Sequence, residues 1–175
     1  MTGSKASPDP TLDGTLAEAR RLLERGELDG ATRGFAEMRE RRPERPEGPL
    51  GLATIAARQE EWQAAFVLAT EAIEREATCL DAYLLLAEIA WFGGMPDMAI
   101  GWLEAGIQPM QGEPLLFEWL VRLYAMDGRL EELKHCLGHY AGLRRMKVHD
   151  AALVFARDAN LPTDVRSRIV AASRS

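Results

Sequence analysis

The sequence predicts an all-α fold: a right-handed superhelix, or α–α solenoid, of four 34-residue helical hairpins closed by C-terminal capping helices. The first observation is a fixed internal period, because Ala31, Ala65 and Ala99 lie 34 residues apart. The second is that glycine recurs with this period where hairpins would turn, at Gly94 and Gly128. The third is composition: alanine, leucine, glutamate and arginine dominate and aromatic residues make up 7%, which favours helix over sheet.

Five columns of residues keep this spacing, and each suits one position in a pair of packed helices. Small residues let two helix backbones approach closely, bulky apolar residues fill the space beside them, and glycine permits the positive φ of a helix end. Because Glu60 replaces glycine in the second turn, we expect a different turn geometry there. The columns are Ala31, Ala65, Ala99, Leu133; Phe35, Ala69, Leu103, Leu137; Gly26, Glu60, Gly94, Gly128; Leu28, Trp62, Pro96, Leu130; and Leu52, Leu86, Leu120.

Proline positions place the helix ends within a few residues. Pro96 and Pro114 suit a first helical turn, which accepts a missing N–H, and Pro43 and Pro109 suit the residues after a helix. Helices are expected near 15–25, 28–41, 48–58, 61–75, 80–92, 96–107, 114–126, 130–143, 149–159 and 163–173. The domain prediction is a disordered tail over 1–12, four repeats over 13–145 (about 12–45, 46–79, 80–113 and 114–147) and capping helices over 148–175.

The third and fourth units resemble the tetratricopeptide repeat (TPR) family, of bacterial type and without an assigned subfamily. The resemblance is carried by Tyr83, Leu86, Ala87, Gly94, Ala99 and Leu103, and then by Phe117, Leu120, Tyr124, Gly128 and Leu130. It covers about residues 12–145 and departs from the pattern at Glu18, which occupies the usual leucine column. It implies a superhelix whose first helices line a concave groove, a role in holding peptides or partner proteins, and no catalysis.

In that arrangement, the repeat spacing selects the side chains that would face the groove. The third and fourth units contribute far more apolar residues than the first two, and a solvent-facing surface of this kind is unusual unless something binds to it. Tryptophan gives a large rigid contact area, and methionine adapts to varied shapes. An alternative is that Trp91 and Phe92 simply pack against neighbouring helices. The predicted partner-binding residues are Leu50, Leu84, Leu85, Glu88, Trp91, Phe92, Leu115, Trp119, Arg122 and Met126.

Charge and targeting signals limit the classes of partner. The net charge of −6 argues against a nucleic-acid binder, which needs clustered basic residues to neutralise phosphates. Residues 141–175 nevertheless carry seven basic and three acidic residues, which leaves −10 for the remainder. A solvated helix surface is favoured over docking on an acidic partner. No stretch is long and apolar enough to span a membrane, Cys79 and Cys136 suggest no disulfide framework, and a cytoplasmic location is expected.

The residues that could carry chemistry favour structural roles. His135 and His139 share a helix face at a spacing that could hold zinc, but no third ligand lies at motif spacing. Gly93-Gly94 lacks the lysine of a phosphate loop and is interpreted as a turn. We therefore predict no catalytic residue, no metal and no cofactor.

The sequence leaves three classes of function. The favoured one is a protein–protein interaction scaffold that binds an apolar or amphipathic segment in the groove. The alternative is a small secretion-type chaperone that shields a hydrophobic client, and an enzyme ranks third. A protein or peptide partner is expected and a homodimer is left open. The capping helices should cover the last repeat with Val154, Phe155, Val165 and Ile169.

Overall fold

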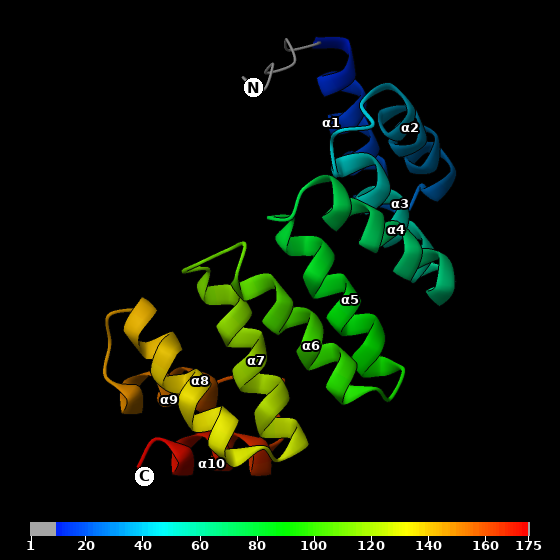
Figure 1. Ribbon diagram of the computed structural model, residues 1–175. Helices are drawn as coiled ribbons and strands as arrows, with labels where there is room; N and C mark the ends of the chain where they lie inside the picture. Colours follow the sequence, from blue (N-terminus) through cyan, green and yellow to red (C-terminus); the bar gives the residue numbers. More distant parts are fainter. Residues whose placement is uncertain (1–9, 175) are drawn as a thin grey trace. The chain divides into compact units, whose positions relative to one another are not determined.

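The computed structural model describes residues 10–174, and within this range the chain forms ten α-helices and no strand (Figure 1). It divides into two compact units between Leu85 and Leu86, inside α5. The helices are α1 (Pro10–Arg25), α2 (Leu28–Arg41), α3 (Glu47–Arg58), α4 (Trp62–Arg75), α5 (Leu80–Phe92), α6 (Pro96–Ile107), α7 (Pro114–Asp127), α8 (Leu130–Leu143), α9 (Val148–Ala156) and α10 (Thr163–Ala172).

The first helix begins earlier than predicted, and this corrects the boundary of the expected tail. Residues 10–12 belong to α1, because proline is tolerated in a first helical turn and Leu12 is only 3% exposed. Burying that leucine offsets the entropy of ordering the turn before it. The rest of the predicted tail, residues 1–9, lies outside the described part of the chain.

The last hairpin also departs slightly from prediction. Helix α9 ends at Ala156 rather than near residue 159, because Asp158 Oδ1 accepts a hydrogen bond from the Asn160 amide at 3.0 Å and starts a local turn. The other predicted ends agree with the structure within one residue, apart from the start of α1.

Two of the repeat columns occupy equivalent buried environments, as the period predicts. Ala31, Ala65, Ala99 and Leu133 are all fully buried, and so are Ala69, Leu103 and Leu137 in the second column. Phe35 is the fourth member of that column, with nearly all of its surface covered. The second helix of each pair therefore presents the same two positions to its neighbours.

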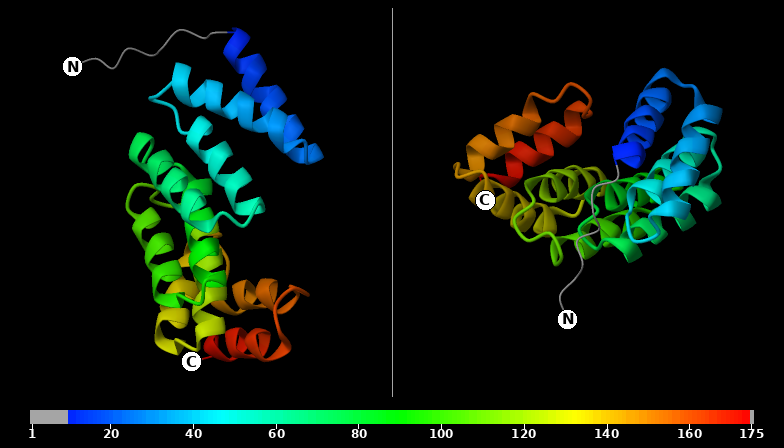
Figure 2. Two further views of the ribbon diagram at one scale, coloured as in Figure 1. Left: turned by 90° about the vertical axis from the view of Figure 1, so that its right-hand side faces the viewer. Right: turned by 90° about the horizontal axis from the view of Figure 1, so that it is seen from above.

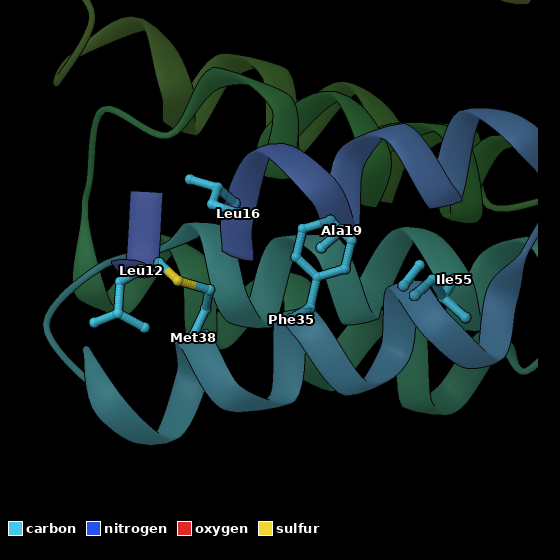
Figure 3. Close-up of a cluster of buried hydrophobic side chains, with 7 residues drawn as sticks. Leu12, Leu16, Ala19, Phe35, Met38 and Ile55 are labelled. Atoms are coloured by element: carbon cyan, nitrogen blue, oxygen red, sulfur yellow. The ribbon is translucent and has the colours of Figure 1, made fainter. Parts of the chain in front are cut away.

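The core of the first unit shows how this packing is built. Leu12, Leu16 and Ala19 of α1 meet Phe35 and Met38 of α2, with Ile55 of α3 completing the cluster (Figure 3). Figure 3 shows the Phe35 ring next to Ala19, where the small side chain leaves room for it. An aromatic residue on α2 is thus accommodated by alanine on α1, which is the alternation of large and small that close helix packing requires.

All four hairpin turns share one backbone conformation, so the expected difference at the second turn is wrong. Gly26, Gly94 and Gly128 have φ values of 77°, 72° and 81°, and Glu60 has 61°. The hydrogen bonds also correspond: Glu61 N donates to Ala56 O at 2.9 Å, as Met95 N does to Ala90 O. The contacts that close the helix end outweigh the cost of a left-handed conformation at an L-residue.

Replacing Glu60 with glycine is therefore expected to raise the free energy of unfolding by about 1 kcal/mol, because it removes a left-handed strain of about 1–2 kcal/mol at the cost of some chain entropy. Urea denaturation monitored by circular dichroism measures the change. The control is Gln59→Gly, since Gln59 has a normal φ of −89° and should gain nothing. Equal or lower stability of Glu60→Gly would contradict this account of the turn.

The second unit ends in the hairpin of α9 and α10, which lie side by side (Figure 2) and pack against α7 and α8. Phe155, Val165 and Ile169 are buried, as expected of residues that cover the last repeat. Val154 is 47% exposed, which corrects its predicted role: it lies one position from Phe155, about 100° around the helix, and faces solvent.

Candidate partner-binding surface

Helix α7 carries four of the predicted partner-binding residues. Two residues of the sequence, Glu113 and Pro114, determine where this helix begins. Pro114 occupies the first turn, where a missing N–H costs nothing. The Glu113 carboxylate accepts a hydrogen bond from the Leu115 amide at 3.0 Å, which satisfies one of the free donors at the helix end. The direction of every later side chain on α7 follows from this fixed start.

Four predicted residues form a stripe along α7. At 100° per residue, Leu115, Trp119, Arg122 and Met126 fall within about 60° of one another around the helix axis. All four side chains are partly exposed, whereas Leu116, Leu120, Val121, Leu123, Tyr124 and Ala125 are buried. We call these four residues the α7 stripe.

Arg122 is held by the protein itself. Its Nη2 lies 2.9 Å from Glu118 Oε1 and 3.1 Å from Asp158 Oδ2, and its guanidinium lies over the Phe155 ring at 5.6 Å from the centroid. The sequence predicts Arg122 at the edge of a binding groove. In the structure it also fastens the end of α9 to α7, a contact between residues 36 positions apart that the sequence gives no means to foresee.

The C-terminal hairpin borders the stripe at further points. Arg168 of α10 donates a hydrogen bond to the Ala125 carbonyl near the end of α7. Phe155 packs against the Tyr140 ring of α8, with the centroids 5.3 Å apart. The stripe therefore has a fixed neighbour on one side, which limits the directions from which a partner can approach.

Helix α5 contributes three predicted residues to the second unit. Glu88 is exposed, Trp91 is partly buried and Phe92 is 75% exposed. The alternative interpretation, in which both aromatic rings simply pack inward, does not apply to Phe92.

Exposed apolar side chains of the second unit that sequence reasoning missed lie near the interhelical turns. Met95 and Met98 follow Phe92 at the start of α6, and Leu130 begins α8. Asp97 and Arg129, the chain neighbours of Met98 and Leu130, form an ion pair. Leu130 stands in the same repeat column as Trp62, and both side chains are exposed. The shared column is the sequence signal that relates these two positions.

The remaining predicted residues belong to the first unit. Leu50 packs against the buried cluster of Ala72, Cys79 and Ala82, so part of its surface is used internally. Leu84 and Leu85 of α5 are partly buried. The predicted set is thus divided between the units, with Leu50, Leu84 and Leu85 in the first and the other seven residues in the second.

The two thiols are unsuited to nucleophilic chemistry at neutral pH. Burial, with a smaller contribution from Glu104, raises the pKa of the Cys136 thiol to about 12, and burial also raises the pKa of Cys79. Tyr124 has a pKa above its usual range because of burial and its hydrogen bond to the Glu104 carboxylate. These groups therefore stay protonated.

The histidine pair of α8 lacks the further ligands of a metal site. His135 and His139 do converge, with their Nε2 atoms 3.1 Å apart. Within residues 10–174, however, no group of three or more histidine, cysteine, aspartate or glutamate side chains could hold a metal ion.

None of the described helices has the length and apolar character to cross a membrane.

The fold is similar to that of solved helical-repeat proteins. Residues 41 to the end of MamA from Desulfovibrio magneticus RS-1 align over 93% of both chains, with a TM-score of 0.60 and 16% identity. TTC0263, a thermophilic TPR protein in Thermus thermophilus, aligns over 94% of this chain and all of its own, with a TM-score of 0.60 and 17% identity. The TPR2B domain of yeast Sti1, solved in complex with pHsp70, aligns over 78% of this chain and 98% of its own, with a TM-score of 0.54 and 16% identity.

These similarities establish the fold as that of the TPR helical-repeat solenoids, as the sequence predicts. No family model and no curated protein matches the sequence.

Proposed function

We propose that the protein is a protein–protein interaction scaffold that holds an apolar or amphipathic segment of a partner on the α7 stripe. The observation that carries the proposal is the partial exposure of Leu115, Trp119 and Met126 on a helix whose other apolar residues are mostly buried. Tryptophan at the centre of an apolar surface is a frequent anchor in protein interfaces. The Sti1 domain, which shares the fold, was solved with a partner bound, and this supports the class of function.

The polar neighbours of the stripe favour an amphipathic partner over a purely apolar one. The Glu118–Arg122–Asp158 network lies beside the apolar side chains and is partly solvated. A partner that placed an apolar residue on this network would remove charged groups from water without replacing their hydrogen bonds. The preferred segment therefore has apolar residues over Trp119 and Met126 and polar residues over the network.

Replacing Trp119 by alanine is expected to weaken partner binding about thirtyfold, since truncating a central interface tryptophan costs about 2 kcal/mol. The measurement is a quantitative affinity capture from extract of the source cells, followed by titration of each captured protein with wild-type and variant chains. The matched control is Trp62→Ala, because Trp62 is an exposed tryptophan of the first unit outside the predicted surface. Circular dichroism establishes that both variants keep the helical fold.

The comparison of Trp119→Ala with Trp62→Ala decides whether the α7 stripe binds the partner. A protein lost with Trp119→Ala and retained with Trp62→Ala supports the proposal. Equal retention by both variants removes the α7 stripe as the binding surface.

The secretion-type chaperone is the alternative function. It is favoured by the exposed Met95 and Met98 close to the exposed Phe92, since flexible methionine side chains adapt to varied clients. Hydrogen exchange of the complex distinguishes the two functions, because the amides of a chaperone client remain unprotected.

A further inference from the structure

A pocket of about 480 Å³ lies among α6, α7 and α8, on the side of α7 that faces away from the stripe. Phe117, Leu120 and Tyr124 line it from α7, and these residues lie between about 130° and 190° around the helix from the middle of the stripe. The pocket belongs entirely to the second unit. It is thus separate from the surface of the proposed function, and it falls in the size range of ligand sites in proteins.

Aromatic rings form one wall of this pocket. The Phe117 ring stacks on the His139 imidazole with the centroids 5.7 Å apart and an interplanar angle of 23°. His135 meets His139 edge to face at 4.6 Å between centroids. Ile107 and Leu120 add aliphatic surface. A flat or long apolar group that enters the pocket would contact this wall.

Carboxylates supply the remaining charge around the pocket. Glu104 accepts a hydrogen bond from the Tyr124 hydroxyl, and Glu131 forms an ion pair with Lys134 at 3.1 Å. The Glu132 carboxylate makes no hydrogen bond or ion pair with the residues that the structure describes, although it lines the same pocket. Among the described residues, no lysine or arginine lines the pocket. Its field therefore favours a cation, and a carboxylate remains to bind it.

We propose that this pocket binds an arginine side chain presented by a partner protein. The guanidinium is planar, so it can lie against the Phe117–His139 wall while donating paired hydrogen bonds to the Glu132 carboxylate. The methylene stem of the arginine then covers Ile107 and Leu120. Lysine offers the same charge without the flat surface or the forked donors, and a neutral side chain of the same length offers only the stem.

The test is an NMR titration of the ¹⁵N-labelled full chain with blocked amino acids. The probes are N-acetyl-arginine-N-methylamide and its lysine and norleucine counterparts. The arginine probe is expected to shift the amides around Phe117, His135 and His139 in a saturable manner, with affinity in the order arginine, lysine, norleucine. Equal binding of norleucine, or shifts confined to the α7 stripe, would overturn the proposal.

Two variants link the binding to the pocket. Glu132→Gln is expected to weaken the arginine probe about tenfold, the value of one charged hydrogen bond of about 1.4 kcal/mol. Glu74→Gln is the charge-matched control, because Glu74 is an exposed carboxylate on α4 in the first unit, and it should change nothing. The same loss in both variants would show a general charge effect and would contradict a built site.

A further arm distinguishes a peptide side chain from a free small molecule. Free L-arginine has the same net charge as the blocked form, but its α-ammonium and α-carboxylate are strongly hydrated and would lose water at the mouth of the pocket, so it should bind no more tightly than the blocked form. Tighter binding of free arginine would overturn the assignment to a partner protein and would indicate a metabolite site instead. Because Trp119 lies on the other side of α7, Trp119→Ala should leave the arginine probe unaffected, so this proposal and the scaffold proposal fail independently.

Discussion

Replacing Phe155 by alanine is expected to lower the free energy of unfolding of the second unit by about 3–5 kcal/mol, the usual cost of truncating a buried phenylalanine. The ring is almost fully buried, packs against Tyr140 and lies under the Arg122 guanidinium. Removing the ring leaves a cavity where the C-terminal hairpin packs against α7 and α8. The Arg122 guanidinium also loses its contact with the aromatic ring.

Val154→Ala provides the control for this prediction, because the neighbouring side chain is largely exposed and should cost less than about 0.5 kcal/mol. Urea denaturation gives the overall change, and native-state hydrogen exchange locates it. The amides of α9 and α10 should lose protection first, since the cavity opens beneath them. A loss below about 1 kcal/mol in the Phe155 variant would mean that the hairpin is attached mainly through other contacts.

Replacing Gly51 by alanine is expected to destabilise the first unit by about 1–3 kcal/mol, through overpacking. A methyl group at this position of α3 would lie 2.2 Å from the Phe35 ring, closer than any real contact, so the ring or the helix must move. Phe35 projects from α2, is buried against α1 and α3, and has little freedom to turn away. Glycine here serves close helix approach rather than an unusual backbone conformation.

A glycine-to-alanine substitution in α6 should have the opposite effect on the free energy of unfolding, and it serves as the comparison for Gly51→Ala. Gly101 lies in α6, and an added methyl group there would meet nothing within 4 Å. Gly101→Ala is therefore expected to stabilise the protein by up to about 1 kcal/mol, through helix propensity alone. Thermal denaturation of the two variants measures both effects. Stabilisation by Gly51→Ala would show that α3 and Phe35 can separate without cost.

Arg122 shows why the candidate site was only partly predictable. The 34-residue period predicts Arg122 on the groove-facing side of α7 together with Trp119 and Met126, and in the structure these three side chains share one partly exposed side of the helix. Its partner Asp158 belongs to the C-terminal hairpin, which departs from the repeat, so no column relates the two residues. A periodic sequence predicts contacts among the repeat units, but it does not predict contacts with a segment that lacks the repeat.

The amino-acid sequence by itself determined the helices, their order, the positions of the hairpin turns and the buried columns. These features follow from local spacing: 3.6 residues per turn and a repeat of 34 fix which side chains must be covered. Only the tertiary structure decided the left-handed conformation of Glu60, the burial of Leu12, the anchoring of Arg122 and the pocket beside Phe117. Each of these four features depends either on atoms brought together from separate helices or on a balance of opposing local energies. The spacing of residues along the sequence predicts neither kind of cause.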